Sequence, residues 1–408
     1  MTRRISTPCW SRPAGISGIE YHGFGARRTV SVDAYVLLDR GGTASKIRFA
    51  KDRQRHLWER RMIDLLSDTV TLPTQEMRRA MFNAEVGDAG YGEDPTLNRL
   101  EALAAEMLGK EDAAFLSSGC QGNLAALLAH CPRGHEVIVG DHSDLYDFEA
   151  GSVSVVGGLV LHPVPTETDG RLSLNNLRSA IRDKCDYQCA PPGVIVLENP
   201  HCQRGGRVLP TSYIKEVREL ADEHGLPLHL DGARIFNAAI ASKKTAAEIA
   251  KDFDSIMFSL SKGLAAPFGS MVCGTRRFID RVRRYRKLLG GGLRQAGFMA
   301  SAGIVALQTM VDRLIEDHRR AQLLAEKIRD IPGIRLDSPV IDTNMVFFRL
   351  ERDGLSVADF LAALSQRGVR MGTLRDGVVR AVLHYLVTDD DVDATAVAIR
   401  SVLQAEPQ

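Results

Sequence analysis

The stretch Leu226-Pro-Leu-His-Leu-Asp-Gly-Ala-Arg234 joins a short apolar run to an acidic residue at its end. Such a run, bounded by turn residues, is typical of a strand that is buried on both faces. The next run of this kind is Ser255–Ser259, and it leads into Leu260-Ser-Lys-Gly263. Asp231 and Lys262 therefore both follow buried strands, and we expect them at the same edge of a sheet.

The same pattern extends outward from this stretch in both directions. Helical periodicity separates several of the runs, which indicates an α/β fold with a mainly parallel sheet covered on both faces. The remaining strands are expected at Ala113–Leu116, Glu136–Val139, Gly193–Leu197 and Ser270–Gly274, and helices at Pro95–Leu108, Asn123–His130 and Thr211–His224.

A second, smaller α/β unit is predicted towards the C-terminus. The sequence predicts one long helix over Ala300–Ile328, followed by strands at Asn344–Leu350 and Val378–Leu383 and helices at Ser356–Arg367 and Asp389–Leu403. A chain of 408 residues exceeds what one hydrophobic core usually fills. We therefore expect a large cofactor-binding domain over residues 62–315 and a small C-terminal domain over residues 316–408.

Residues 1–61 differ from the rest of the chain. They hold Pro, Gly and Ser early and then a dense basic run from Lys46 to Arg61, with little apolar periodicity. Two interpretations stay open: a loosely ordered extension, or a stretch that is not translated, with Met62 as the start. Neither gives these residues a catalytic role. Arg3 and Arg4 precede no apolar segment, so the pattern does not indicate a secretory signal.

The composition narrows the function classes. Fifty-two basic and 51 acidic residues give a formal charge of +1, and no apolar stretch reaches the length of a membrane span. We therefore expect neither a nucleic-acid nor a membrane partner. An odd number of scattered cysteines, seven, fits reduced thiols in a cytoplasmic protein. A zinc site from Cys185, Cys189, His201 and Cys202 is a weaker alternative, and we expect no metal.

Three segments carry the expected chemistry. Lys262, placed after a strand between Ser261 and Gly263, suits an amine that forms a Schiff base. A carboxylate at the end of the neighbouring strand, Asp231, can pair with a protonated pyridine nitrogen. Ser117-Ser-Gly-Cys-Gln-Gly-Asn123 is a strand-to-helix turn whose N–H groups can bind a phosphate. Each segment alone also fits an ordinary turn, but the three together indicate pyridoxal 5′-phosphate (PLP).

At this point the sequence resembles the low-specificity threonine aldolases, PLP enzymes of the aspartate-aminotransferase fold type that are grouped with β-eliminating lyases. The resemblance runs from Met62 to about Asp391. The motifs that carry it are Ser67-Asp-Thr-Val-Thr71, Tyr91-Gly-Glu-Asp-Pro95, Glu198-Asn-Pro-His201, Gly205-Gly-Arg-Val-Leu-Pro210, Asp231-Gly-Ala-Arg-Ile-Phe-Asn237, Leu260-Ser-Lys-Gly-Leu264 and Arg286-Lys-Leu-Leu-Gly-Gly-Gly-Leu-Arg-Gln295. The family commonly opens with a segment like Met62–Thr71, which favours Met62 as a start.

The resemblance implies a role for each matching residue. Lys262 looks like the Schiff-base lysine and Asp231 like the partner of the pyridine nitrogen, with Ser261 beside them. The implied phosphate turn is Ser118, Gly119 and Cys120, where the family usually has threonine at Cys120. The implied holders of the substrate α-carboxylate are Ser67, Arg234 and Arg380, with Arg234 also beside the cofactor. Lys287 and Arg294 match positions near the cofactor phosphate that a neighbouring subunit sometimes contributes. The family is tetrameric or dimeric, and Tyr91 and Asp94 would lie near the interface.

Two departures from the family lie where the substrate side chain would be recognised. A histidine that stacks on the cofactor usually precedes the element Phe148-Glu-Ala-Gly151 by four residues, and Asp144 stands there. A carboxylate cannot stack as an imidazole does. His142, two residues earlier, is the alternative for this role if the loop shifts. Pro200 stands before His201 where threonine is usual, which stiffens the loop.

The implied reaction is the cleavage of a β-hydroxy-α-amino acid, such as threonine or allo-threonine, to glycine and an aldehyde. His201 is the candidate acid–base group at the substrate hydroxyl, because the pKa of an imidazole lies near neutrality. Asp144 is the second candidate. The alternatives are β-elimination, racemisation or aldol condensation on the same scaffold, and, least favoured, a protein without catalytic activity. We expect a cytoplasmic homotetramer or homodimer with shared active sites.

Overall fold

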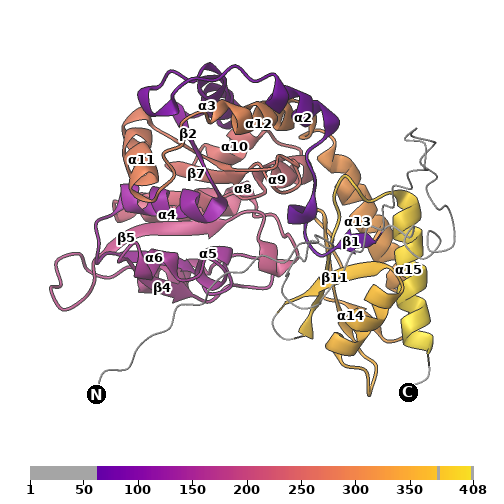
Figure 1. Cartoon of the computed structure of the whole chain (residues 1–408). Helices are drawn as coiled ribbons and strands as arrows, with labels where there is room; N and C mark the ends of the chain where they lie inside the picture. Colours follow the sequence, from indigo (N-terminus) through magenta and orange to yellow (C-terminus); the bar gives the residue numbers. More distant parts are fainter. Residues whose placement is uncertain (1–61, 375–376, 406–408) are drawn as a thin grey trace, which may run out of the picture. The chain divides into compact units, whose positions relative to one another are not determined.

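The computed structural model describes residues 62–374 and 377–405. The predictions for residues 1–61 lie outside the described residues. A seven-stranded sheet dominates the larger part of the chain (Figure 1). Its strands, in spatial order, are β2 (Asp112–Leu116), β8 (Ser270–Gly274), β7 (Ser255–Ser259), β6 (Leu228–Asp231), β5 (Pro192–Glu198), β3 (Glu136–Gly140) and β4 (Val160–Val164).

The sheet is mainly parallel, as predicted, and only β8 runs antiparallel to its two neighbours. The carboxyl ends of β6 and β7 lie side by side, with Asp231 paired in register with Met257. The last residue of β6 is Asp231 itself, one residue beyond the predicted end of the strand. The sheet edge predicted to collect the functional residues is thus present.

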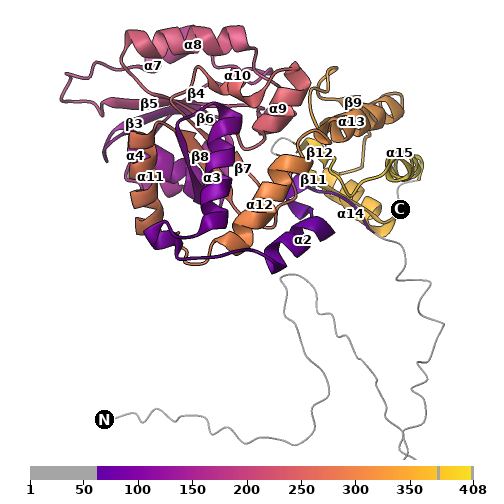
Figure 2. The same ribbon diagram turned by 90° about the horizontal axis from the view of Figure 1, so that it is seen from above.

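Helices cover both faces of this sheet, because alternate side chains of each strand point to opposite sides. Figure 2 shows α7 and α8 on one side of the strands and α4 and α11 on the other. On the first side, α3, α7, α8, α9, α10 and α12 share a core with strand residues such as Ile195 and Phe258. On the second side, α4, α5, α6 and α11 pack against residues such as Val196 and Met257.

The helices have the following bounds. They are α2 (Gln75–Phe82), α3 (Pro95–Leu108), α4 (Gly119–His130), α5 (Asp144–Asp147), α6 (Ser152–Val155), α7 (Leu174–Ala180), α8 (Thr211–Glu223), α9 (Ile235–Ser242), α10 (Ala246–Ala250), α11 (Arg276–Leu288), α12 (Gly297–Thr309), α13 (Leu314–Ile328), α14 (Val357–Gln366) and α15 (Asp389–Gln404), with 3-10 turns η1 (Asp68–Val70), η2 (Ala89–Tyr91) and η3 (Cys202–Arg204). Helix α4 begins four residues earlier than predicted, directly in the glycine-containing turn.

A five-stranded sheet forms the smaller part of the chain. Its order is β1 (Ile63–Leu65), β11 (Val369–Thr373), β12 (Val379–Val382), β10 (Met345–Leu350) and β9 (Ile334–Leu336). The parallel pairing of β1 with β11 brings residues near the start of the described chain into the C-terminal sheet. Strands β1, β4, β9 and β11 were not predicted, and three of these four are short or lie at a sheet edge.

The single long helix predicted over Ala300–Ile328 is wrong. The structure has two helices, α12 and α13, whose axes are bent by 67° at a short break. The two helices belong to different cores: α12 is apolar on most sides and packs in the larger unit, whereas Ala321 and Leu324 of α13 pack in the smaller one. Packing against two separate sheets forces the bend, which local periodicity does not reveal.

Within the described residues, no single helix is long and apolar enough to cross a membrane. Helices α12 and α13 meet the length and composition only when taken together as a bent pair.

Candidate functional site

Lys262 lies in the tight turn that follows β7. Its carbonyl oxygen accepts hydrogen bonds from the Thr71 hydroxyl at 3.0 Å and from the Ala265 amide at 2.9 Å. Ala265 adopts a left-handed conformation with φ of 62°, which closes the turn. The Lys262 backbone is therefore held both by its own turn and by a residue near the start of the described chain, while the side chain stays half-buried.

Asp231 lies at the end of the adjacent strand and is 2% exposed. Its carboxylate accepts hydrogen bonds from the Ala233 amide at 3.1 Å and from the Asn123 side-chain amide at 2.9 Å. Burial raises the pKa of Asp231, and the nearby positive charge of Lys262 opposes that rise. The two residues that the sequence placed at one sheet edge are thus close enough to interact.

The predicted phosphate turn forms the start of helix α4. Ser118 is the N-cap, and its hydroxyl accepts a hydrogen bond from the Gln121 amide at 3.2 Å. The amides of Gly119 and Cys120 occupy the first positions of the helix, where N–H groups have no acceptor within the helix and favour an anion. A Cβ atom at Gly119 would lie 3.4 Å from both Met257 and Ser259, so glycine allows close approach to β7.

These three elements suit PLP. The backbone N–H groups at the start of α4 can donate hydrogen bonds to a phosphate. Asp231 can pair with a ring nitrogen, and Lys262 supplies a primary amine. Ser261 lies beside the lysine. Cys120 has no hydroxyl to offer a phosphate, but its backbone amide is available. Burial raises the pKa of its thiol, which therefore stays neutral.

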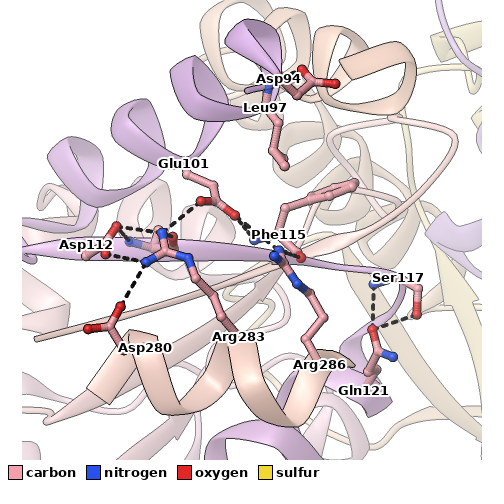
Figure 3. Close-up of polar contacts among 11 residues, drawn as sticks. Asp94, Leu97, Glu101, Asp112, Phe115, Ser117, Gln121, Asp280, Arg283 and Arg286 are labelled. Atoms are coloured by element: carbon pink, nitrogen blue, oxygen red, sulfur yellow. Dashed lines mark hydrogen bonds and ion pairs between the residues drawn. The ribbon is translucent and has the colours of Figure 1, made fainter. Parts of the chain in front are cut away.

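A network of arginines and acids fixes the strand that leads to this turn (Figure 3). Glu101 of α3 accepts hydrogen bonds from the Phe115 amide at 2.9 Å, from Arg283 at 2.8 Å and from Arg286 at 3.2 Å. Arg286 also donates to the Phe115 carbonyl oxygen at 2.7 Å. Strand β2 is therefore held at Phe115, two residues before the turn begins.

Gln121 then links the turn to helix α11. Its side-chain oxygen accepts from the amide and the hydroxyl of Ser117 at 3.0 and 2.9 Å (Figure 3). Its side-chain nitrogen donates to the Leu289 carbonyl oxygen at 3.3 Å. The start of α4 and the end of α11 therefore form one connected unit.

Arg234 is held in a buried ion pair that was not predicted. Its Nε and Nη2 donate to the two carboxylate oxygens of Asp68, each at 2.7 Å, and its Nη1 contacts the Cys202 sulfur at 3.5 Å. Burial alone would raise the pKa of Asp68, but the charge and hydrogen bonds of Arg234 bring it down to about 2. Asp68 thus orients one edge of the guanidinium, and the Nη1 edge faces away from the pair.

The other two predicted carboxylate-binding residues lie on the small sheet and next to it. Arg380 is on β12, and its Nη2 donates to the Leu66 carbonyl oxygen at 3.2 Å. Its Nε is buried without a hydrogen-bond partner among the described residues. Ser67 directly follows Leu66 and is the N-cap of η1. The electrostatic interaction of Cys202 with both Arg234 and Arg380 indicates that these two arginines approach the same place.

Asp144 occupies the first turn of the short helix α5. Its backbone amide donates to Glu198 Oε2 at 2.9 Å, and Glu198 Oε1 accepts from the Cys202 amide at 2.7 Å. Burial raises the pKa of Glu198, and the charges of Asp144 and Asp231 raise it further. Asp144 is therefore part of the acidic surroundings of Asp231.

His201 is buried, with 2% of its surface exposed, and its Nδ1 has no hydrogen-bond partner among the described residues. Burial lowers its pKa to about 3, and the Arg204 charge acts in the same direction. Its charged neighbours are Arg204, His142 and Asp141, and none of these is a predicted cofactor residue. The imidazole is thus neutral. Asp144 interacts with Asp231 and Glu198, whereas the charged neighbours of His201 lie outside that group.

Lys287 and Arg294 line a separate cavity of about 620 Å³, together with Tyr91, Arg283 and Arg286. Arg294 pairs with Asp88 at 3.1 Å. Tyr91 is 77% exposed, whereas Asp94 is buried, caps α3 and accepts a hydrogen bond from the Gly297 amide at 2.8 Å. Among the described residues, no hydrogen bond or ion pair joins the lining of this cavity to Lys262 or Asp231.

The zinc alternative finds no support in the described residues. Cys185 is exposed, and the Cys189 sulfur lies 3.7 Å from Asp186. Where potential ligand atoms do approach one another within 4.8 Å, they belong to Asp144, Glu198 and Cys202. Burial raises the pKa of Cys202 to about 11, so that its thiol is a poor ligand.

Three residues of the site had no predicted role: Asp68, Asn123 and Glu149. All are buried polar side chains, with 0%, 0% and 7% of their surface exposed. Each lies inside a quoted motif, in Ser67–Thr71, Ser117–Asn123 and Phe148–Gly151. The motifs therefore contained the signal, but only the fold shows which side chains point towards Arg234 and Asp231.

Comparison with known proteins places the chain in a family. The model of the β-eliminating lyase family matches residues 64–351. The chain therefore belongs to the β-eliminating lyases, a family of PLP-dependent enzymes. This membership confirms the predicted cofactor and the predicted class, a PLP-dependent lyase.

The relatives are more specific. Low-specificity L-threonine aldolase 1 of Arabidopsis thaliana is 43% identical over 338 residues, which cover 82% of this chain and 94% of that protein. Low specificity L-threonine aldolase of Escherichia coli K12 is 43% identical over 343 residues, covering 84% and 99%. The predicted resemblance to the low-specificity threonine aldolases is thus confirmed.

The fold is confirmed by a solved structure. A threonine aldolase of Leishmania major superposes with a TM-score of 0.70 at 22% identity, covering 83% of this chain and 99% of that chain. The predicted α/β fold of the PLP-dependent type I class is therefore correct.

Proposed function

We propose that the chain is a PLP-dependent aldolase that cleaves a β-hydroxy-α-amino acid, such as threonine or allo-threonine, to glycine and an aldehyde. The observation that carries the proposal is the placement of Lys262 and Asp231 at one sheet edge, with Asp144 interacting with both Asp231 and Arg234. The names of the relatives support the substrate class.

The residues that would hold the cofactor are those of the three elements. Lys262 would bind it covalently, Asp231 would face the ring nitrogen, and the amides of Ser118, Gly119 and Cys120 would hold the phosphate. When bound, PLP supplies an electron sink for the electrons that leave the broken Cα–Cβ bond.

The substrate carboxylate would bind to arginine. Asp68 occupies the Nε–Nη2 edge of Arg234, and Nη1, which donates one hydrogen to the Cys202 sulfur, has a second N–H for an incoming anion. The unpartnered Nε of Arg380 and the hydroxyl of Ser67 would complete the site. Two arginines suit a planar carboxylate, because each guanidinium presents donors in a fixed fork.

Two groups are proposed to accept the β-hydroxyl proton. His201 is a neutral imidazole with an unpartnered Nδ1, so it can act as a base. Asp144 lies closer to Asp231 and Glu198 and is the second candidate. Replacing each separately and measuring the pH dependence of kcat/KM distinguishes them, because only loss of the true base removes the acidic limb.

The enzyme is further proposed to act in the cytoplasm as a homotetramer or homodimer. Lys287 and Arg294 line a cavity that no hydrogen bond or ion pair among the described residues joins to Lys262, which is the arrangement expected if they serve the phosphate of a neighbouring subunit. Sedimentation analysis tests the assembly. Mixing Lys262→Ala with Arg294→Ala protein tests shared sites, because hybrid oligomers should regain part of the lost activity.

A substrate panel tests the proposal. The purified protein is incubated with PLP and with L-threonine, L-allo-threonine or phenylserine, and glycine and aldehyde are measured. We expect both products from at least one substrate, and loss of the visible cofactor band in Lys262→Ala. Formation of a 2-oxo acid and ammonia would show β-elimination instead, and racemisation would change optical rotation alone. Absence of a visible band in the wild type would overturn the cofactor site.

A further inference from the structure

One amide joins two buried carboxylates beside the site. The side-chain nitrogen of Asn123 donates to Asp231 Oδ2 at 2.9 Å and to Glu149 Oε1 at 2.8 Å. Asn123 is completely buried, and Glu149 is 7% exposed. Two carboxylates this close in a poorly solvated place cannot both keep a full negative charge without a large energetic cost.

The orientation of the Asn123 amide is set by a chain of hydrogen bonds behind it. The Asn123 oxygen lies 3.2 Å from His229 Nε2, which must therefore donate. His229 Nδ1 must then accept from the Ser255 hydroxyl at 2.7 Å, and Ser255 in turn accepts from His130 Nε2 at 2.6 Å. Burial lowers the pKa of both histidines to about 3, so both are neutral as this assignment requires.

The two carboxylates differ in how well their charge is stabilised. Asp231 receives hydrogen bonds from Asn123 and Ala233 and lies near the Lys262 cation. Glu149 receives one hydrogen bond, from Asn123, and its Oε2 is buried without a partner among the described residues. The carboxylate with more hydrogen bonds and a nearby cation keeps the charge, so a proton shared by the pair resides on Glu149.

The other groups around Glu149 act in the same direction or only weakly against it. Asp144 of α5 and Asp231 of β6 disfavour a charge on Glu149, and Cys120 of α4 faces it with a thiol whose pKa is raised. Lys262 favours a negative charge on Glu149, but its effect on the pKa of Glu149 is the smallest of these. Burial, followed by the Asp231 charge, raises the pKa of Glu149 to about 8.

We propose that Glu149 is a positioning residue that carries a proton next to Asp231, and that Asn123 connects the two so that Asp231 keeps the negative charge that faces the cofactor ring. This inference rests on the proposed role of Asp231. Neutral Glu149 lets Asp231 remain ionised at neutral pH. Deprotonation of Glu149 at higher pH adds a second negative charge beside the ring and changes its electrostatic surroundings.

Infrared difference spectroscopy of the apoprotein tests the protonation directly. Between about pH 6.5 and about pH 9.5 the wild type should lose a carboxylic-acid C=O band with a midpoint near 8. Glu149→Gln should lack this titrating band, because glutamine has nearly the same shape and cannot ionise. The control Asp317→Asn also removes a buried carboxylate with a raised pKa, but Asp317 lies on α13 and pairs with Arg313. That variant should keep the band with its midpoint near 8.

The visible spectrum of the bound cofactor provides the second readout. Wild type and Glu149→Gln should have the same spectrum near neutral pH and diverge above about pH 8, where only the wild type gains the extra charge. Asn123→Ala should bind PLP at least about tenfold more weakly, because Asp231 loses a hydrogen bond to its charged form.

A band with a midpoint near 8 that is as intense in Glu149→Gln as in the wild type, or spectra that coincide at every pH, would overturn the inference. If the wild type shows no visible band at all with PLP, the proposed function fails instead. The infrared result on the apoprotein is independent of that outcome.

Discussion

Glu101 and Glu149 are both 7% exposed, yet their surroundings differ completely. Glu101 receives hydrogen bonds from Arg283, Arg286 and the Phe115 amide, so its charge is fully compensated (Figure 3). Glu149 receives one amide hydrogen bond and faces Asp231 and Asp144. The environment of Glu101 stabilises the fold. The environment of Glu149 brings acidic side chains together at an energetic cost, as is typical of functional sites.

The difference extends to the two regions that surround these residues. The α3–α11 network matches Glu101, Asp112 and Asp280 with two arginines. Around Asp231, the acids Asp144, Glu149 and Glu198 gather near one lysine, and Asp68 already compensates Arg234. A cofactor with a cationic ring would offset the negative charges around Asp231, and a substrate carboxylate would pair with the arginines there. Neither would change the charges of the α3–α11 network.

The largest effect is expected from breaking the one compensated pair in the acidic region. Asp68→Ala leaves the buried Arg234 without its partner and should lower the free energy of unfolding by about 3–5 kcal/mol. Urea unfolding of the apoprotein measures the loss. Asp88→Ala breaks the exposed pair with Arg294 and should cost less than about 1 kcal/mol. Equal losses in the two variants would contradict the assigned burial.

Glu149→Gln should alter the pH dependence of stability. Because folding raises the pKa of Glu149 from 4.5 to about 8, its stabilising contribution is complete below 4.5 and is lost as pH rises through 8. The wild type should therefore lose stability relative to the variant over this window, by about 1.4 kcal/mol for each pH unit between the two pKa values. Unfolding free energies measured along a pH series give the difference. A constant difference at all pH values would contradict the raised pKa.

Glu101→Gln should lower stability by about 2 kcal/mol at neutral pH, because the buried hydrogen bonds of two arginines lose their charged acceptor. Urea unfolding is again the measurement. The cofactor spectrum should keep the wild-type pH dependence in this variant. If that pH dependence changes as it does in Glu149→Gln, the two glutamates are not functionally distinct.

Asp144→His removes one acid from the acidic region and introduces the residue that the resemblance to the threonine aldolases implies at this position. We expect threonine cleavage to rise about tenfold in kcat/KM, which corresponds to about 1.4 kcal/mol of transition-state stabilisation. Glycine release from L-threonine and L-allo-threonine gives the comparison. Unchanged kinetics on both substrates would move the determinant of specificity away from position 144.

Most of the larger sheet could be predicted, because its strands are near-continuous apolar runs whose ends carry Asp231 and Lys262. The strands β7 and β8 were predicted to the residue. The short β1 could not be, because three residues carry no periodicity and its partner β11 is about 300 residues away. The bend between α12 and α13 depends likewise on which core each helix joins.

The candidate site, too, could be predicted only in part. The residues that touch cofactor or substrate in the resemblance lie in local motifs and could be named from sequence. Asp68, Asn123 and Glu149 could not be assigned, since their roles depend on contacts with Arg234 and Asp231 across more than 80 residues. The direction in which a buried carboxylate pKa moves depends on such distant neighbours.

The pairing of β1 with β11 has a consequence for synthesis of the protein. Asp64 contacts Arg370 across 306 residues, and Leu66 contacts Arg380 across 314. Translation at about 5–20 residues per second separates the emergence of these partners from the ribosome by roughly 15–60 s. A nascent chain that already holds Lys262 and Asp231 still lacks Arg380. The growing polypeptide therefore cannot assemble the proposed carboxylate site until it is nearly finished.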